Sequence, residues 1–189
     1  MPSFEYDLGY LREAVELLED YILSKDIYWN LNANSPPGEP GYPALTLGAV
    51  LLAEARLQGR ELTEVQDRKF SLLQQETDRI RAKWRTNWGN KAREEFRSRL
   101  NLWGKFVEDF RRDPQGNFDR YNYEVNRRVM LELLEAEALE IPIAQRELLE
   151  GFDKILSAIM VPGEFVWDEQ FEAGFPTERF PCLYLTLRD

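Results

Sequence analysis

Apolar residues recur at alternating spacings of three and four over long stretches of this chain, and this pattern constrains the fold more than any other. The clearest stretch, 91–112, carries Phe96, Leu100, Trp103, Val107 and Phe110. In an α-helix such residues form one stripe along the helix surface. The spacing therefore predicts an amphipathic helix that buries this stripe.

The same periodicity predicts helices in five further stretches: 7–25, 46–57, 63–84, 118–139 and 148–159. Asp7 stands where an N-cap would accept from the free amides of the first turn. Thr63 precedes Gln66 by three residues, which is the spacing of a capping box. Gly59 is a typical residue just past a helix end. We expect residues 87–90, Asn-Trp-Gly-Asn, to separate the helices on either side.

Two regions do not fit a helix. Residues 30–43 contain four prolines and two glycines, so a long loop is expected there. From Gly163 onward, aromatic and β-branched residues alternate with polar ones, and the segments 165–167 and 183–187 could pair as a short hairpin or lie extended as a strap.

The predicted fold is therefore all-α: a compact bundle of five or six helices, roughly 60% helical against a globular average of about a third. Residues 1–189 should form a single domain. We expect residues 1–161 to form the bundle and 162–189 an extended tail packed on it.

The sequence contains no histidine and one cysteine, Cys182. Histidine-based acid–base catalysis, nucleophile triads and zinc fingers are thereby excluded, and no cofactor is expected. Cys182 lies in an apolar run, which favours a buried, unreactive thiol. The acidic N-terminus lacks the order of a signal peptide and no stretch is apolar enough to span a membrane. We expect a cytoplasmic protein without a membrane partner.

The net charge of −10 is unevenly distributed, since residues 79–112 hold eleven Lys and Arg but only four acids. Bases interleaved with tryptophan are typical of surfaces that bind phosphate or single strands. The candidate binding residues of this basic segment are Arg81, Arg85, Trp88, Arg93 and Arg97. The simpler interpretation is that these bases pair with acids elsewhere in the chain or in another subunit.

Two other features could carry chemistry. The loop at 30–43 could present Tyr42 and nearby Trp29 for recognition, although a stiff connector explains the same composition. Glutamates three residues apart, such as Glu132 and Glu135, share a helix face and could hold Mg²⁺ if two such pairs met. A magnesium-dependent all-α phosphohydrolase is therefore one alternative function.

The favoured function is a non-enzymatic interaction or scaffold module that self-associates. The chain has no phosphate-binding glycine loop, cysteine cluster or nucleophile motif. Its five tryptophans and eight tyrosines are residue types that anchor interfaces. A homo-oligomer or a protein partner is expected, and a nucleic-acid-binding or phosphate-binding module is the second alternative.

Overall fold

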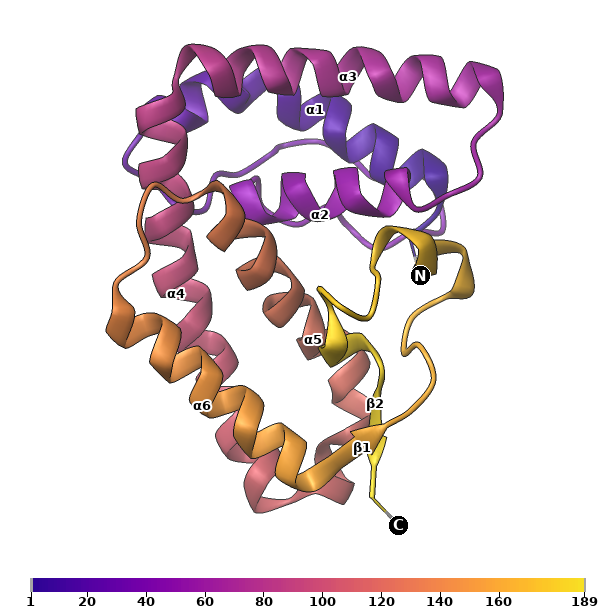
Figure 1. Cartoon of the computed structure of the whole chain (residues 1–189). Helices are drawn as coiled ribbons and strands as arrows, with labels where there is room; N and C mark the ends of the chain where they lie inside the picture. The colour runs from indigo at the N-terminus through magenta and orange to yellow at the C-terminus, as the bar shows by residue number, and fades with distance from the viewer. Residues whose placement is uncertain (1, 189) are drawn as a thin grey trace.

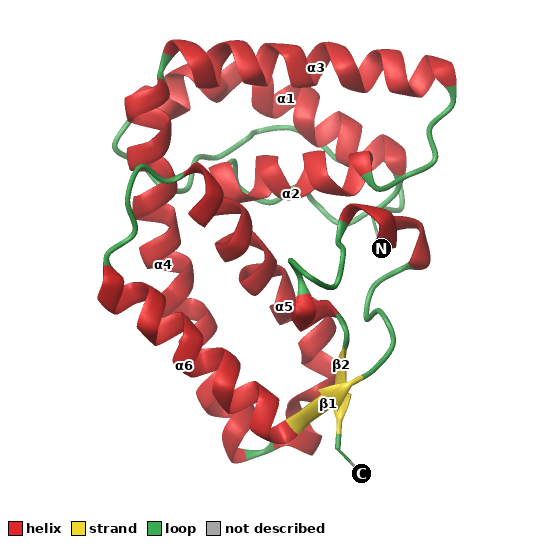
Figure 2. Cartoon of the chain, in the orientation of Figure 1, coloured by secondary structure: helices red, strands yellow, loops and turns green. Residues whose placement is uncertain are grey.

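A computed structural model describes residues 2–188 and confirms the all-α prediction, with about 70% of the chain helical. Figure 1 shows the arrangement and Figure 2 shows that strand is confined to a short hairpin near the C-terminus. The described residues form six α-helices, two 3₁₀ helices and two strands: α1 (Phe4–Leu23), α2 (Leu47–Gln58), α3 (Glu64–Lys83), α4 (Arg85–Arg112), α5 (Pro114–Glu137), α6 (Ile143–Ile159), β1 (Met160–Pro162), η1 (Glu169–Gly174), η2 (Pro181–Leu183) and β2 (Leu185–Leu187).

The helices form two groups. In Figure 1, α1, α2 and α3 lie across the top of the view, whereas α4, α5 and α6 run down from them. Helices α4 and α5 share the most extensive contact, and α2 joins the groups by packing on both α1 and α5. All five residues of the stripe predicted within 91–112 are buried in α4. Among residues 2–188, no helix combines the length and the apolar character that crossing a bilayer requires.

Local signals placed some helix ends correctly. The capping box of Thr63 and Gln66 is present at the start of α3, and Thr46 caps α2 through its side chain. The prediction that Asp7 caps the first helix was wrong, because Ser3 does so. Asp7 is instead fully buried, where its carboxylate accepts from Arg56 Nη2 at 2.6 Å. The role of Asp7 therefore depends on Arg56, which lies 49 residues away in the sequence.

Gly89 lies inside a continuous helix, so the expected interruption at 87–90 was wrong. The break occurs at Trp84, and α4 begins at Arg85. A Cβ atom at Gly89 would lie 2.5 Å from Leu139 Cγ, so glycine here permits close packing. The fifth helix also begins earlier than expected, with Asp113 as its cap and Pro114 in its first turn.

Gly59 ends α2, but with a φ of −74° and not in the left-handed conformation typical of a terminal glycine. Its role is packing: a Cβ there would lie 2.8 Å from the backbone of Gly174 and Phe171. The C-terminal segment can therefore cross α2 in direct contact with its backbone.

The predicted hairpin is present, but its first strand is β1 and not residues 165–167. Met160 pairs with Leu187 and Pro162 with Leu185, antiparallel. Trp167 instead turns inward, edge-on to Phe175 at 5.2 Å between ring centroids. The Cys182 thiol is buried as expected, and burial raises its pKa to about 12. The Cys182 carbonyl accepts from Tyr121 Oη at 2.6 Å, which fixes the tail to α5.

The N-terminus of α2 lies inside the protein against an ion pair from α4. Glu95 is fully buried, and its two carboxylate oxygens accept from the Gly48 amide at 3.1 and 3.0 Å. Arg99, one turn further along α4, donates from Nε to Glu95 at 2.6 Å and from Nη2 to the Thr46 hydroxyl at 2.8 Å. The carboxylate thus satisfies a helix amide and a buried guanidinium together.

We predict that Glu95→Gln lowers the free energy of unfolding by about 3 kcal/mol, because it leaves the Arg99 charge buried without its counterion. Glu94→Gln is the matched control, since Glu94 is only partly buried and pairs with the exposed Arg97. The control should change stability by less than about 1 kcal/mol. If urea unfolding gives equal losses of unfolding free energy for the two variants, the stabilising role of the buried pair is contradicted.

Candidate interaction groove

The basic segment is largely neutralised within the chain. Eight of its eleven bases lie within 4.0 Å of an acid: Arg79, Arg81, Lys83, Arg93, Arg97, Arg99, Arg111 and Arg112. Lys91 donates instead to the carbonyls of Ser24 and Asp26, at 2.9 and 2.7 Å. Arg85 and Lys105 have no ion-pair partner among residues 2–188. Pairing thus accounts for most of the charge asymmetry.

Arg81 and Trp88, two of the candidate binding residues, do lie together. The Arg81 guanidinium lies over the Trp88 ring, 4.9 Å from its centroid. Trp88 is only 2% exposed, and its Nε1 donates to Glu137 Oε2 at 2.8 Å. A nucleobase could stack on the face covered by Arg81 only after this guanidinium had moved away.

Arg93 and Arg97 are four residues apart on α4 and share one acid, Glu94, at 3.6 and 2.7 Å. Arg85 stands exposed at the start of the same helix. The structure therefore brings together two pairs, Arg81 with Trp88 and Arg93 with Arg97. It does not join them to Arg85 around an exposed aromatic ring.

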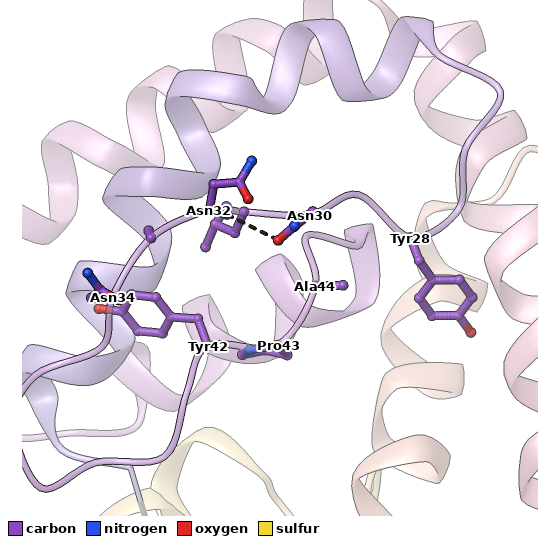
Figure 3. Close-up of a pocket in the computed structure, with 9 residues that line it drawn as sticks. Tyr28, Asn30, Asn32, Asn34, Tyr42, Pro43 and Ala44 are labelled. Carbon is purple, nitrogen blue, oxygen red and sulfur yellow. Dashed lines mark hydrogen bonds between the residues drawn. The ribbon is translucent and has the colours of Figure 1, made fainter.

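A cavity of about 580 Å³ lies between the two legs of the long loop that joins α1 and α2 (Figure 3). Exposed Asn30, Asn32 and Asn34 alternate along one leg with the buried Leu31. Tyr42 and Pro43 come from the other leg. The lining is uncharged, and its polar groups are exposed to solvent.

Tyr42 and Trp29, the two loop residues predicted for recognition, both hold the loop in place. The Tyr42 ring packs edge-on to Tyr6, at 5.0 Å between centroids, and lies over Gly9, where a Cβ would be 2.3 Å from the Tyr42 hydroxyl. Trp29 exchanges two backbone hydrogen bonds with Leu45, at 3.0 and 2.8 Å. Tyr42 also lines the cavity, whereas Trp29 does not.

A groove of about 520 Å³ between α4 and α6 has the most apolar lining of these hollows. Leu100 and Gly104 of α4 face Leu148 and Phe152 of α6 across it. A Cβ at Gly104 would lie 2.5 Å from Phe152 Cζ, so the glycine lets this ring approach α4 closely. Leu148 remains 46% exposed. The groove is thus a partly uncovered extension of the core.

The charged residues that line this groove all come from α4: Lys105, Glu108, Asp109 and Arg112. Glu108 and Asp109 pair with Arg111 and Arg112, whereas Lys105 has no ion-pair partner in the described chain. On α6, Glu147 and Glu150 are exposed and likewise unpaired within residues 2–188, but they are not part of the lining. This groove was not among the predicted sites. The signal that could have found it is a second apolar stripe on α6, formed by residues 148, 152, 155 and 159.

The helical glutamates are engaged by bases. Glu132 lies 3.4 Å from Arg128 Nη1 and 3.8 Å from Arg179 Nε, and Glu19 binds Lys83 at 2.5 Å. Across residues 2–188, no group of three or more His, Cys, Asp or Glu side chains is arranged to hold a metal ion. The convergence of glutamates that the phosphohydrolase alternative requires is therefore not found there.

Comparison with protein-family models, with curated proteins and with solved structures finds no match to this chain. Function is consequently inferred from side-chain geometry. Of the hollows described so far, the α4–α6 groove combines apolar area with unpaired charge, which are the components of a protein interface.

We predict that Trp88→Phe lowers the free energy of unfolding by about 1 to 3 kcal/mol, because it removes a buried hydrogen bond to a carboxylate. Trp84→Phe is the control: Trp84 Nε1 donates to Glu19 at 2.9 Å, but Glu19 is at the surface and can be resolvated by water. Thermal denaturation should show the smaller loss for Trp84→Phe. The reverse order would contradict the buried role of Trp88.

Proposed function

We propose that this protein is a self-associating interaction module whose α4–α6 groove receives helix α6 of a second copy. The observation that supports this is an apolar floor, formed by Leu148 and Phe152, next to Lys105, a base without an ion-pair partner in the described chain. An apolar strip with a polar rim is the usual composition of an interface.

A surface that is complementary to itself favours a second copy of the chain over an unrelated partner. A two-fold interface uses the same patch twice, so the patch must be complementary to itself. Here α6 supplies Glu147, the neighbour of Leu148, and α4 supplies Lys105, and neither has an ion-pair partner within residues 2–188. When α6 of one copy lies along the groove of the other, Glu147 at the edge of its apolar stripe meets Lys105, and the symmetry repeats the contact.

The helices that form the groove are long enough for such a contact. Helix α6 has 17 residues, which corresponds to about 25 Å at a rise of 1.5 Å per residue. Only Leu149 and Leu156 of this helix are buried in the single chain. Ile143 at its N-terminus is exposed. Stable homodimers bury about 800 Å² or more per partner, so the proposed contact has to extend from the groove onto the adjoining α4 surface.

The two alternative functions have weaker geometric support. Nucleic-acid binding would need exposed bases around an accessible ring, whereas Trp88 is buried and eight bases are engaged by acids. Magnesium-dependent hydrolysis would need clustered carboxylates, and the described residues offer no such cluster. Self-association is therefore the function proposed.

We predict that the wild-type protein is dimeric at micromolar concentration in sedimentation velocity and that Leu148→Arg is monomeric. A charged side chain at this position would be buried without a counterion in the interface. Val65→Arg, at an exposed apolar position on α3, should leave the dimer intact. A wild-type monomer at 100 µM would overturn the proposal.

Charge reversal tests the docking mode separately. Lys105→Glu should weaken the dimer about tenfold or more, because it places like charges opposite each other. Adding Glu147→Lys to the same chain should restore it. A double variant that stays as weak as Lys105→Glu would contradict the arrangement of α6 in the groove, even if the protein is dimeric.

A further inference from the structure

A smaller cavity, of about 200 Å³, lies where α2, α3, α5 and the C-terminal segment meet. Its volume is several times the roughly 30 Å³ that one water occupies in the liquid. Gly174 allows the C-terminal segment to close one side, since a Cβ there would lie 2.6 Å from the Ala55 carbonyl oxygen. The apolar part of the lining comes from Leu51, Ala55, Leu133, Ala136 and Phe180.

Glu54 of α2 lines this cavity and is only 6% exposed. Its Oε1 is buried and has no hydrogen-bond partner, while its Oε2 lies 3.9 Å from Arg81 Nη2, too far for a hydrogen bond. The neighbouring Thr77 hydroxyl donates its proton to the Leu73 carbonyl at 3.1 Å. Buried polar atoms are rarely left in this state, so the Glu54 carboxylate is short of hydrogen-bond donors.

The charges around Glu54 come from α3, α5 and the C-terminal segment. Arg81 Nη1 binds Asp78 at 3.0 Å, and Arg81 Nε lies 3.3 Å from Glu137. Arg179 is also in the lining. Arg81 is shared by Asp78 and Glu137, and Arg179 lies 3.8 Å from Glu132, so an ionised Glu54 has no base within hydrogen-bond distance.

Burial raises the pKa of Glu54 to about 7, although Arg81 acts in the opposite direction. The Asp78 and Glu137 carboxylates raise the pKa further. Near neutral pH, this side chain therefore exists in both protonation states. A group that donates hydrogen bonds and carries positive charge would stabilise the ionised state.

We propose that this cavity binds a small aliphatic amine, with its ammonium group on the Glu54 carboxylate and its alkyl chain against Leu51 and Leu133. The ammonium supplies a donor that the Glu54 carboxylate lacks and compensates its negative charge. When Glu54 is protonated beforehand, binding releases its proton to solvent. No covalent bond forms or breaks.

The probe is n-butylamine, titrated into the full chain by calorimetry at pH 8 and pH 6, with butan-1-ol as the neutral analogue. With a pKa of about 7, roughly a tenth of Glu54 is ionised at pH 6, while the amine stays protonated at both pH values. We expect binding of butylamine to be about tenfold weaker at pH 6 and butan-1-ol not to bind at either pH. Equal affinities at the two pH values, or equal binding of the alcohol, would overturn the proposal.

Glu54→Gln should abolish butylamine binding at both pH values. The control is Glu64→Gln, an exposed position at the start of α3, which should bind as the wild type does. Leu148→Arg should also bind normally, because the groove and this cavity share no residue. Loss of self-association and loss of amine binding are therefore separate results. Retention of binding by Glu54→Gln would place the amine elsewhere.

Thermal unfolding of Glu54→Gln tests the charge of Glu54 without a ligand. The folded pKa is above the ordinary value of 4.5, so proton binding stabilises the fold fully below about pH 4.5, and this stabilisation is lost as the pH rises to 7. The glutamine variant has no such loss. Its Tm should therefore rise relative to the wild type between pH 4.5 and pH 8. A constant difference would show that Glu54 ionises normally and would remove the basis for ammonium binding.

Discussion

The structure depends on how the N-terminus of α2 is satisfied inside the protein. A buried helix start exposes unpaired amides and partial positive charge, and the Glu95 carboxylate of α4 meets both at Gly48. Arg99, one turn along α4, balances that carboxylate. Because α4 thereby fixes the position of α2, the surfaces that α2 presents to α1, α5 and the C-terminal segment follow from this contact. A Cβ at Gly48 would lie 2.7 Å from Glu95 Oε1, so the contact also requires glycine there.

Features that depend on near neighbours in sequence could be predicted. The buried stripe of α4 and the capping box at Thr63 follow from spacings of three and four residues, and both are present. Errors arose where a distant residue decides the structure. Asp7 has the composition of a cap but binds Arg56, and Gly89 has the composition of a break but packs on Leu139. No local pattern encodes either contact.

The candidate sites likewise combine features that follow from local sequence with features that depend on distant residues. Charge counting located the basic segment, and much of its pairing is with acids three residues away on the same helix, as for Arg97 and Glu94. That Trp88 would be covered by Glu137 of α5 depends on which helices are neighbours. The groove could not be foreseen, because periodicity shows that α6 has a wide apolar face but not how much of that face α4 covers. Glu54 is recognisable in the sequence as the single acid in the apolar stretch 47–57.

Three buried carboxylates lie on or against α2, and their surroundings differ in a way that bears on function. Glu95 accepts from a backbone amide and from Arg99, and Asp7 accepts from Nε and Nη2 of Arg56. Both charges are therefore compensated by fixed donors, which is how proteins tolerate buried ions. Glu54 has its charged neighbours at a greater distance, an oxygen without a donor and a cavity in front of it. A donor from outside the chain would complete this site, which makes Glu54, rather than the better-paired Asp7 or Glu95, the acid that we propose responds to a ligand.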